Sequence, residues 1–147
     1  MNIIESELKT VLVVDDDPSI CDFISVLLSR EDYQVITTFR SAETTSLLKS
    51  GSYLRFDLMI LDLQMPGLGG YSIIKNMQTK YYQKAPILVL TGRNLERGTI
   101  EMICAEPNVK GLCKKPISAP ELVRKVRALT GGDEVKVGST VLKFMVV

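Results

Sequence analysis

The sequence predicts an α/β fold in which a parallel sheet is covered by helices on both faces. Two observations support this prediction: apolar runs of strand length alternate with segments of helical period, and the alternation repeats five times before Gly131. Parallel strands need long crossover connections, which are usually helices, so this alternation is typical of a doubly wound sheet. With 147 residues, the chain has the length of one compact domain that buries its own core.

The predicted elements alternate strictly between strand and helix. In order, they are residues 10–14, 18–29, 34–39, 41–50, 56–61, 70–79, 87–90, 94–104, 109–113 and 119–129. The strands are short runs of apolar and β-branched residues, as expected for strands that are buried on both faces. The first helix repeats apolar residues at spacings of three and four, which places them on one helix face.

Capping residues set the predicted ends of the helices. Asp17 before Pro18 is a typical start, because aspartate caps the first turn and proline fits the first helical position. Ser118 gives the last helix a similar start, with a proline two residues later. Ser41 is predicted to cap the second helix, and Gly51 to end it.

Polar residues follow the predicted strands where those strands end. Asp15 and Asp16 follow the first strand, Asp62 the third, Thr91 the fourth and Lys115 the fifth. The carboxyl ends of parallel strands share one edge, so we expect these side chains to gather there. Two carboxylates about 4 Å apart repel by roughly 4 kcal/mol in a medium of intermediate dielectric, so the cluster requires a cation. The pattern therefore indicates a metal site that handles phosphate.

Composition excludes several classes of function. The chain has no histidine, which excludes Ser-His-Asp triads, Cys-His pairs and the usual histidine-bearing zinc sites. A net charge of +1 and the lack of a DNA-binding motif predict no direct binding of nucleic acid. No apolar run approaches the ~20 residues that span a membrane, and the first nine residues lack a secretion signal, so we expect a cytoplasmic chain. The three cysteines, Cys21, Cys104 and Cys113, are expected to be reduced core thiols.

Four short motifs resemble those of the receiver domain of two-component response regulators, a family that includes chemotaxis regulators. They are residues 13–17 (VVDDD), 61–70 (LDLQMPGLGG), 90–92 (LTG) and 114–117 (KKPI). Each motif alone is a weak signal, but here they occur in the family's order and at its usual separations. The resemblance covers roughly residues 9–130, and it implies a flavodoxin-like five-stranded sheet of order 2-1-3-4-5.

The resemblance also implies a chemistry for the strand-end residues. Asp62 would accept a phosphoryl group from the phosphohistidine of a histidine kinase or histidine phosphotransfer protein, and the change would switch contacts with a downstream protein. Such a domain is a phosphoacceptor that assists its own phosphorylation and dephosphorylation rather than an enzyme with a separate substrate. Thr91 and Lys115 would contact the phosphoryl oxygens. The residues implied as ligands of Mg²⁺ are Asp15, Asp16, Asp62 and Gln64, the last through its carbonyl.

The sequence departs from the family pattern at two positions near the site. Leu112 stands three residues before Lys115, where receiver domains usually carry an aromatic side chain that moves inward on phosphorylation. Gly92 follows Thr91 where alanine or another small residue is common, and we expect it to keep access to the site open. The family also has a cis peptide before the proline that here is Pro116, a feature that one sequence leaves undecided.

The resemblance implies a receiver domain at residues 9–131, with an amino-terminal extension at residues 1–8 and a carboxyl-terminal extension at residues 132–147. In the last of these, Gly138-Ser139 separates two β-prone runs, which predicts a hairpin. Three readings stay open: a hairpin packed on the domain, the start of a truncated effector domain, or an edge that pairs with a second copy in a homodimer.

Two other functions compete with phosphorylation-dependent signalling. The apolar carboxyl-terminal extension and Leu112 favour a receiver-fold scaffold or dimerisation module that depends little on phosphorylation. A phosphatase of the haloacid dehalogenase type also uses an aspartate nucleophile and Mg²⁺. It requires a second aspartate two residues after the nucleophile, where this chain has Gln64, so this function is the least favoured.

Overall fold

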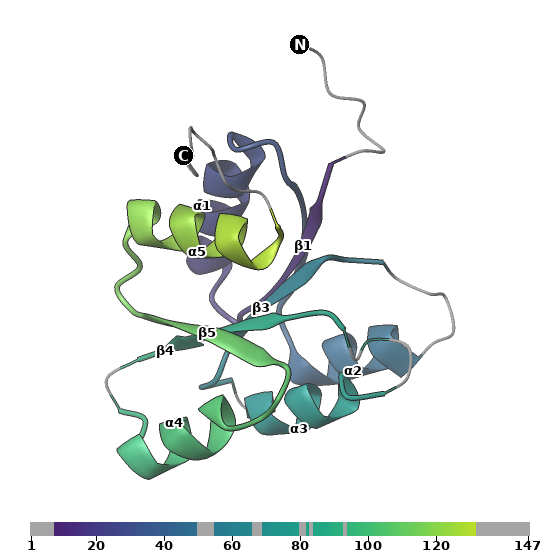
Figure 1. The fold of residues 1–147 in the computed structure, drawn as a ribbon, viewed down its shortest axis with the longest axis vertical. Helices are drawn as coiled ribbons and strands as arrows, with labels where there is room; N and C mark the ends of the chain where they lie inside the picture. The colour runs from purple at the N-terminus through teal and green to yellow at the C-terminus, as the bar shows by residue number, and fades with distance from the viewer. Residues whose placement is uncertain are drawn as a thin grey trace.

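The structure, a computed structural model, describes residues 8–49, 55–65, 69–79, 82, 84–92 and 94–131. Its strands are β1 (Thr10–Val14), β2 (Gln34–Thr38), β3 (Leu58–Asp62), β4 (Ile87–Thr91) and β5 (Val109–Lys114). Its helices are α1 (Pro18–Ser29), α2 (Ser41–Lys49), α3 (Gly69–Asn76), α4 (Arg97–Cys104) and α5 (Ala119–Leu129). All strand pairs are parallel, in the order β2-β1-β3-β4-β5 (Figure 1). The predicted flavodoxin-like fold is confirmed.

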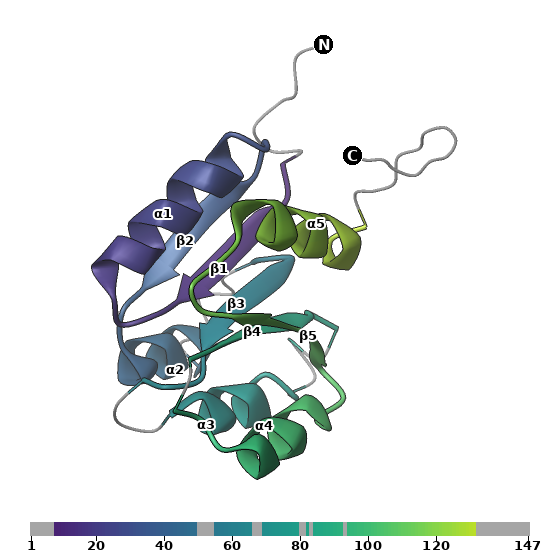
Figure 2. The same cartoon turned by 90° about the vertical axis from the view of Figure 1, so that its left-hand side faces the viewer.

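Two layers of helices cover the sheet. Helices α1 and α5 lie on one face, and α2, α3 and α4 on the other (Figure 2). The sheet has one hydrophobic core on each face. Alternate residues of β1 pack in opposite cores, because side chains alternate across a strand. Val11 and Val13 pack in the core under α1 and α5, whereas Leu12 and Val14 pack in the core under α3. All four are fully buried, which explains why this strand is an unbroken apolar run in the sequence.

The capping predictions hold for two helices and fail by one residue for a third. The Asp17 carboxylate accepts a hydrogen bond from the amide of Ser19 at 2.9 Å, and the Ser118 hydroxyl accepts one from Glu121 at 3.4 Å. Ser41 is instead the first residue of α2. The carbonyl of Arg40 accepts the first helical hydrogen bond, so the cap position is occupied by Arg40.

Helices α3 and α4 are shorter than predicted. Helix α4 begins at Arg97 rather than at residue 94, because Glu96 has an extended backbone and occupies the cap position. Helix α3 ends at Asn76 rather than at residue 79. Helical periodicity continues through turn residues next to a helix, so a pattern alone places such ends poorly.

Several sequence predictions concern residues outside those that the structure describes. They are the hairpin at 132–147, most of the amino-terminal extension, Gly51, and residues 66–68 of the motif at 61–70. Among the described residues, no helix is long and apolar enough to cross a membrane.

The cysteine prediction is correct for two residues and wrong for the third. Cys21 and Cys113 are buried and free, but Cys104 is exposed. Cys104 is the last residue of α4 and directly follows Ile103, the buried residue of that helix, so it lies on the solvent side.

The end of α5 is fixed beside the start of β2. The hydroxyl groups of Tyr33 and Thr130 are hydrogen-bonded at 2.8 Å, and the Arg127 guanidinium lies 5.9 Å from the centre of the Tyr33 ring. Tyr33 directly precedes β2, so these contacts hold the end of α5 at the amino-terminal edge of the sheet.

A polar cluster ties α3 to the loop between α4 and β5. The Glu106 carboxylate accepts hydrogen bonds from Gln78 at 2.7 Å, from the Tyr71 hydroxyl at 3.1 Å and from Lys75 at 3.2 Å. These donors stabilise the charged carboxylate, so the pKa of Glu106 is lowered, chiefly by the Gln78 hydrogen bond and then by Lys75.

Replacing Glu106 with glutamine will make the fold less sensitive to acid. A carboxylate with a lowered pKa stabilises the fold above its unfolded pKa, near 4.5, and this contribution is lost as the pH falls through the folded pKa. Urea midpoints measured from neutral pH down to about pH 3 should therefore fall less steeply for Glu106→Gln than for the unmodified chain. Glu101→Gln removes an exposed carboxylate on α4 as the control. Parallel curves for Glu106→Gln and the unmodified chain would contradict this account.

Candidate functional site

Three carboxylates meet at the carboxyl-terminal edge of the central strands. Asp15 directly follows β1 and Asp62 is the last residue of β3, and these strands are neighbours in the sheet. Together with Asp16, they bring one oxygen each to within 4.8 Å of one another. Asp15 and Asp62 are buried, whereas Asp16 is exposed. The site therefore has a buried floor and one carboxylate that is open to solvent.

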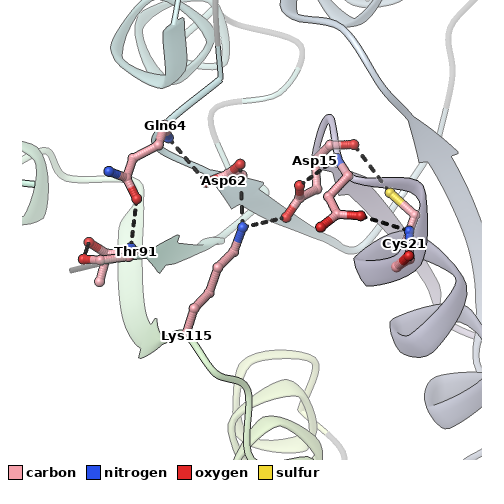
Figure 3. Close-up of polar contacts among 9 residues, drawn as sticks. Asp15, Cys21, Asp62, Gln64, Thr91 and Lys115 are labelled. Atoms are coloured by element: carbon pink, nitrogen blue, oxygen red, sulfur yellow. Dashed lines mark hydrogen bonds and ion pairs between the residues drawn. The ribbon is translucent and has the colours of Figure 1, made fainter. Parts of the chain in front are cut away.

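Lys115 lies between the two buried carboxylates. Its ammonium nitrogen is 3.1 Å from Oδ2 of Asp15 and 3.5 Å from Oδ2 of Asp62 (Figure 3). The backbone amide of Lys115 donates to the carbonyl of Thr91 at 2.8 Å, and the peptide bond between Lys115 and Pro116 is cis. The backbone hydrogen bond to Thr91 fixes the start of the Lys115 side chain just beyond β5, from where the side chain reaches across to β3.

Burial has the largest influence on the pKa values of Asp15 and Lys115. Burial raises the pKa of Asp15, and the charge of Asp62 raises it further, against the Asp17 amide and the Lys115 charge, which lower it. Burial alone would lower the pKa of Lys115, but the two carboxylates outweigh it and the net direction is upward. Lys115 therefore stays charged. One ammonium is set against three carboxylates, so their negative charge is only partly neutralised and would stabilise a further cation.

The donor set fits a hard divalent cation. Oδ1 of Asp15 accepts a hydrogen bond from the amide of Asp17 at 2.9 Å. Oδ2 of Asp15 is buried, and its partner among the described residues is the Lys115 ammonium, 3.1 Å away. Three carboxylates with oxygens this close together, served by one ammonium, suit the oxygen coordination that Mg²⁺ requires.

Thr91 and Gln64 complete the edge of the site. Thr91 is buried at the end of β4, and its hydroxyl donates to the carbonyl of Gly92 at 3.2 Å. The backbone amide of Gln64 donates to Oδ1 of Asp62 at 3.1 Å. The structure thus places all six residues singled out from the sequence at one edge of the sheet, with the Thr91 hydroxyl directed to its neighbour Gly92.

The prediction that Gly92 leaves the site open is wrong. Oε1 of Gln64 accepts a hydrogen bond from the amide of Gly92 at 2.9 Å, and it would lie only 2.3 Å from a Cβ atom added at position 92. The space left by the missing side chain is therefore filled by Gln64. Sequence reasoning identified the unusual glycine, but no pattern in the sequence shows which way the Gln64 side chain points.

Cys21 is close to the site without being reactive. Its thiol donates to the carbonyl of Asp15 at 3.3 Å. Burial and the nearby Asp15 charge raise the pKa of Cys21 to about 11, so the thiol stays protonated at neutral pH. Its role is to support the backbone at Asp15.

Comparison with known families agrees with this geometry. The sequence model described as "Response regulator receiver domain" matches residues 11–127. The chain belongs to this family. Receiver domains are the phosphoacceptor modules of two-component signalling, and the strand-end carboxylates of this receiver domain are arranged accordingly. Leu112, at the position of the usual aromatic residue, is partly buried and packs in the core under α3 and α4.

Individual relatives support the assignment. The chain is 34% identical over 119 residues to the response regulator SaeR of Staphylococcus aureus, and 28% identical over 120 residues to the response regulator GtcR of Aneurinibacillus migulanus. These matches cover 81% and 82% of this receiver domain chain but 49% and 47% of the relatives. The chain therefore spans about half the length of the curated relatives that it matches.

Solved structures of similar fold cover nearly the whole receiver domain. The structure of a response regulator from Chloroflexus aurantiacus matches with a TM-score of 0.73 and 25% identity. The match covers 85% of this chain and 99% of the chain in that structure. The chemotaxis response regulator CheY4 of Vibrio cholerae has a TM-score of 0.71 and 28% identity, and covers 83% and 98%.

Proposed function

We propose that this receiver domain accepts a phosphoryl group on Asp62 in a step that depends on Mg²⁺. The observation that carries the proposal is the position of the Asp62 carboxylate at the sheet edge, with the Lys115 ammonium 3.5 Å away and two further carboxylates beside it. The donor would be the phosphohistidine of a histidine kinase or histidine phosphotransfer protein. In this proposal, residues 9–131 form the phosphoaccepting domain, and this domain acts in the cytoplasm.

The proposed step is an in-line displacement at phosphorus. An Asp62 oxygen forms a bond to phosphorus while the bond between phosphorus and the donor's imidazole nitrogen breaks, and that nitrogen keeps the electron pair. Negative charge spreads over the phosphoryl oxygens, and the Lys115 ammonium is already in place to stabilise it. The Thr91 hydroxyl would turn from the Gly92 carbonyl towards a phosphoryl oxygen.

Asp15, Asp16, Asp62 and the carbonyl of Gln64 would hold Mg²⁺. When bound, the ion neutralises charge on the phosphoryl oxygens and on the crowded carboxylates. Within the protein, Asp15 is positioned for this role by the Asp17 amide, and Asp62 by the Gln64 amide. Both carboxylates are therefore oriented before any ligand arrives.

The output of the domain is a change of protein contacts. In this proposal, phosphorylation shifts the balance between two conformers of the domain, and a downstream protein distinguishes them. A scaffold that ignores phosphorylation remains the alternative. Its main support, the apolar segment at residues 132–147, lies outside the described residues, so the site geometry favours the phosphoacceptor.

Intact mass spectrometry with acetyl phosphate and Mg²⁺ tests the proposal. The protein should gain the mass of one phosphoryl group, and peptide mapping should locate it on Asp62. Chelation of Mg²⁺ should suppress the gain. A protein that gains no phosphoryl group and binds no beryllofluoride under these conditions would overturn the proposal.

Mg²⁺ will raise the unfolding temperature of this receiver domain. A ligand that binds only the folded state stabilises it by about 2.7 kcal/mol at a hundred times its dissociation constant. Asp16→Asn removes an exposed ligand, so it should weaken the effect without unfolding the domain. Asp17→Asn is the matched control, because asparagine caps α1 as well as aspartate does. Equal responses of the two variants to Mg²⁺ would contradict the predicted ligand set.

A further inference from the structure

The Gln64 side chain bridges the two loops that border Asp62. Its backbone amide donates to Asp62 at 3.1 Å, and its side-chain oxygen accepts the amide proton of Gly92 at 2.9 Å (Figure 3). Gln64 is exposed, so burial does not force this arrangement. The bridge spans the space directly beside the phosphoacceptor.

Gly92 admits the Gln64 side chain. A Cβ atom at position 92 would lie 2.3 Å from the Gln64 amide oxygen, which is far inside any normal contact. The backbone of Gly92 is outside the left-handed region, so its conformation does not require glycine. Gln64 and Gly92 are therefore a matched pair: one residue needs the space that the other leaves.

The same peptide segment is held from two sides. The Gly92 amide is bound by Gln64, and its carbonyl is bound by the Thr91 hydroxyl at 3.2 Å. Thr91 ends β4, next to the strand that ends in Asp62. In this arrangement, the hydrogen-bonding groups of the β4–α4 connection nearest to Asp62 are occupied by the protein itself.

We propose that Gln64 is a positioning residue that holds the β4–α4 connection in its unphosphorylated form and releases the Gly92 amide to a phosphoryl oxygen. This inference rests on the proposed phosphorylation of Asp62. A phosphoryl oxygen carries negative charge, and charge-assisted hydrogen bonds are roughly twice as strong as neutral ones, so it displaces the neutral amide oxygen. Because the hydrogen bond between Gln64 and Gly92 must break first, it lowers the affinity of the domain for a phosphoryl group. The free Gly92 amide and the Thr91 hydroxyl then turn to the phosphoryl group.

Beryllofluoride binding to Gln64→Met tests the inference. Methionine keeps the length of the side chain and removes the amide oxygen, so the affinity for beryllofluoride with Mg²⁺ should rise by about 3- to 10-fold, the range of one neutral hydrogen bond. Gly92→Ala should give the same gain, because its methyl group expels the Gln64 amide. The double variant should bind no tighter than either single variant, since both remove one contact. Gly98→Ala is the matched control, because Gly98 has no atoms within 4 Å of an added Cβ, and it should bind as the unmodified protein does.

The amide NMR signal of Gly92 separates positioning from a general structural effect. In the free protein, Gln64→Met should shift this signal and speed its hydrogen exchange. With beryllofluoride bound, the signals of the unmodified protein and of Gln64→Met should coincide, because Gln64 no longer holds the amide in either.

Three outcomes would overturn the inference. They are an affinity for beryllofluoride that does not rise in Gln64→Met, gains that add in the double variant, or a free Gly92 signal that Gln64→Met leaves unchanged. If the unmodified protein itself takes up neither beryllofluoride nor a phosphoryl group, the proposed function fails and this inference fails with it. If the protein without substitutions is phosphorylated and binds beryllofluoride, but the Gln64 and Gly92 variants bind beryllofluoride no more tightly, the inference alone is overturned.

Discussion

Replacing Asp62 with asparagine will abolish phosphoryl incorporation from acetyl phosphate. An amide has no carboxylate oxygen to attack phosphorus, so the loss should be complete rather than partial. Asparagine has nearly the same size, and its oxygen can still accept the Gln64 amide, so the loops around the site keep their support. Intact mass spectrometry after incubation with acetyl phosphate and Mg²⁺ measures the result.

Asp57→Asn provides the matched control for Asp62→Asn. Asp57 lies just before the start of β3, at the opposite edge of the sheet, where its carboxylate accepts a hydrogen bond from the Thr10 amide at 2.8 Å. An asparagine oxygen can accept the same bond, so this variant should be phosphorylated as the unmodified domain is. Full phosphorylation of Asp62→Asn would show that another residue is the acceptor.

Replacing Leu88 with alanine will destabilise the domain by about 2–5 kcal/mol. Leu88 is fully buried on β4, in the core under α1 and α5, and truncation removes its contacts and leaves a cavity. Urea unfolding at equilibrium measures the change, which is a large part of the stability of a typical domain. Val26→Ala on α1 is the control. Val26 is 52% exposed, so its truncation should change stability by no more than about 0.5 kcal/mol.

Gly111 provides a second check on the Leu88 prediction. A Cβ atom at position 111 would lie 2.9 Å from a methyl carbon of Leu88, so Gly111→Ala alone should be destabilising. In Leu88→Ala, the added methyl group fills part of the cavity instead. The double variant should therefore be more stable than the sum of the two single changes predicts. Additive effects would mean that the two side chains do not share this space.

The sheet and the gathering of the site residues could be predicted because both follow from short-range patterns. Five short strands separated by helices leave few topologies, and parallel strands place their carboxyl ends at one edge. Asp15 and Asp62 therefore had to be neighbours once β1 and β3 were. The start of α4 was misplaced because residues 94–96 continue the polar and apolar pattern of a helix without its backbone conformation.

Side-chain direction was the part that the sequence did not reveal. The position of Lys115 between Asp15 and Asp62, rather than towards a ligand alone, depends on the charges that surround it in the folded state. The Gln64 side chain is long and flexible, and its choice of the Gly92 amide depends on a space that exists only after two loops have come together. Such long-range choices have no periodicity that a sequence pattern can show.

The hydrogen bond between Tyr33 and Thr130 fixes the position of the carboxyl-terminal end of α5. It holds the end of α5 beside the start of β2, at the edge of the sheet opposite to Asp62. With 11 residues and a rise of about 1.5 Å per residue, α5 separates the two edges by about 16 Å. The phosphoacceptor and the carboxyl-terminal end of α5 thus lie at opposite edges of the sheet, with the length of α5 between them. A spectroscopic label on residue 131 would therefore report movement of α5 without contacting Asp62.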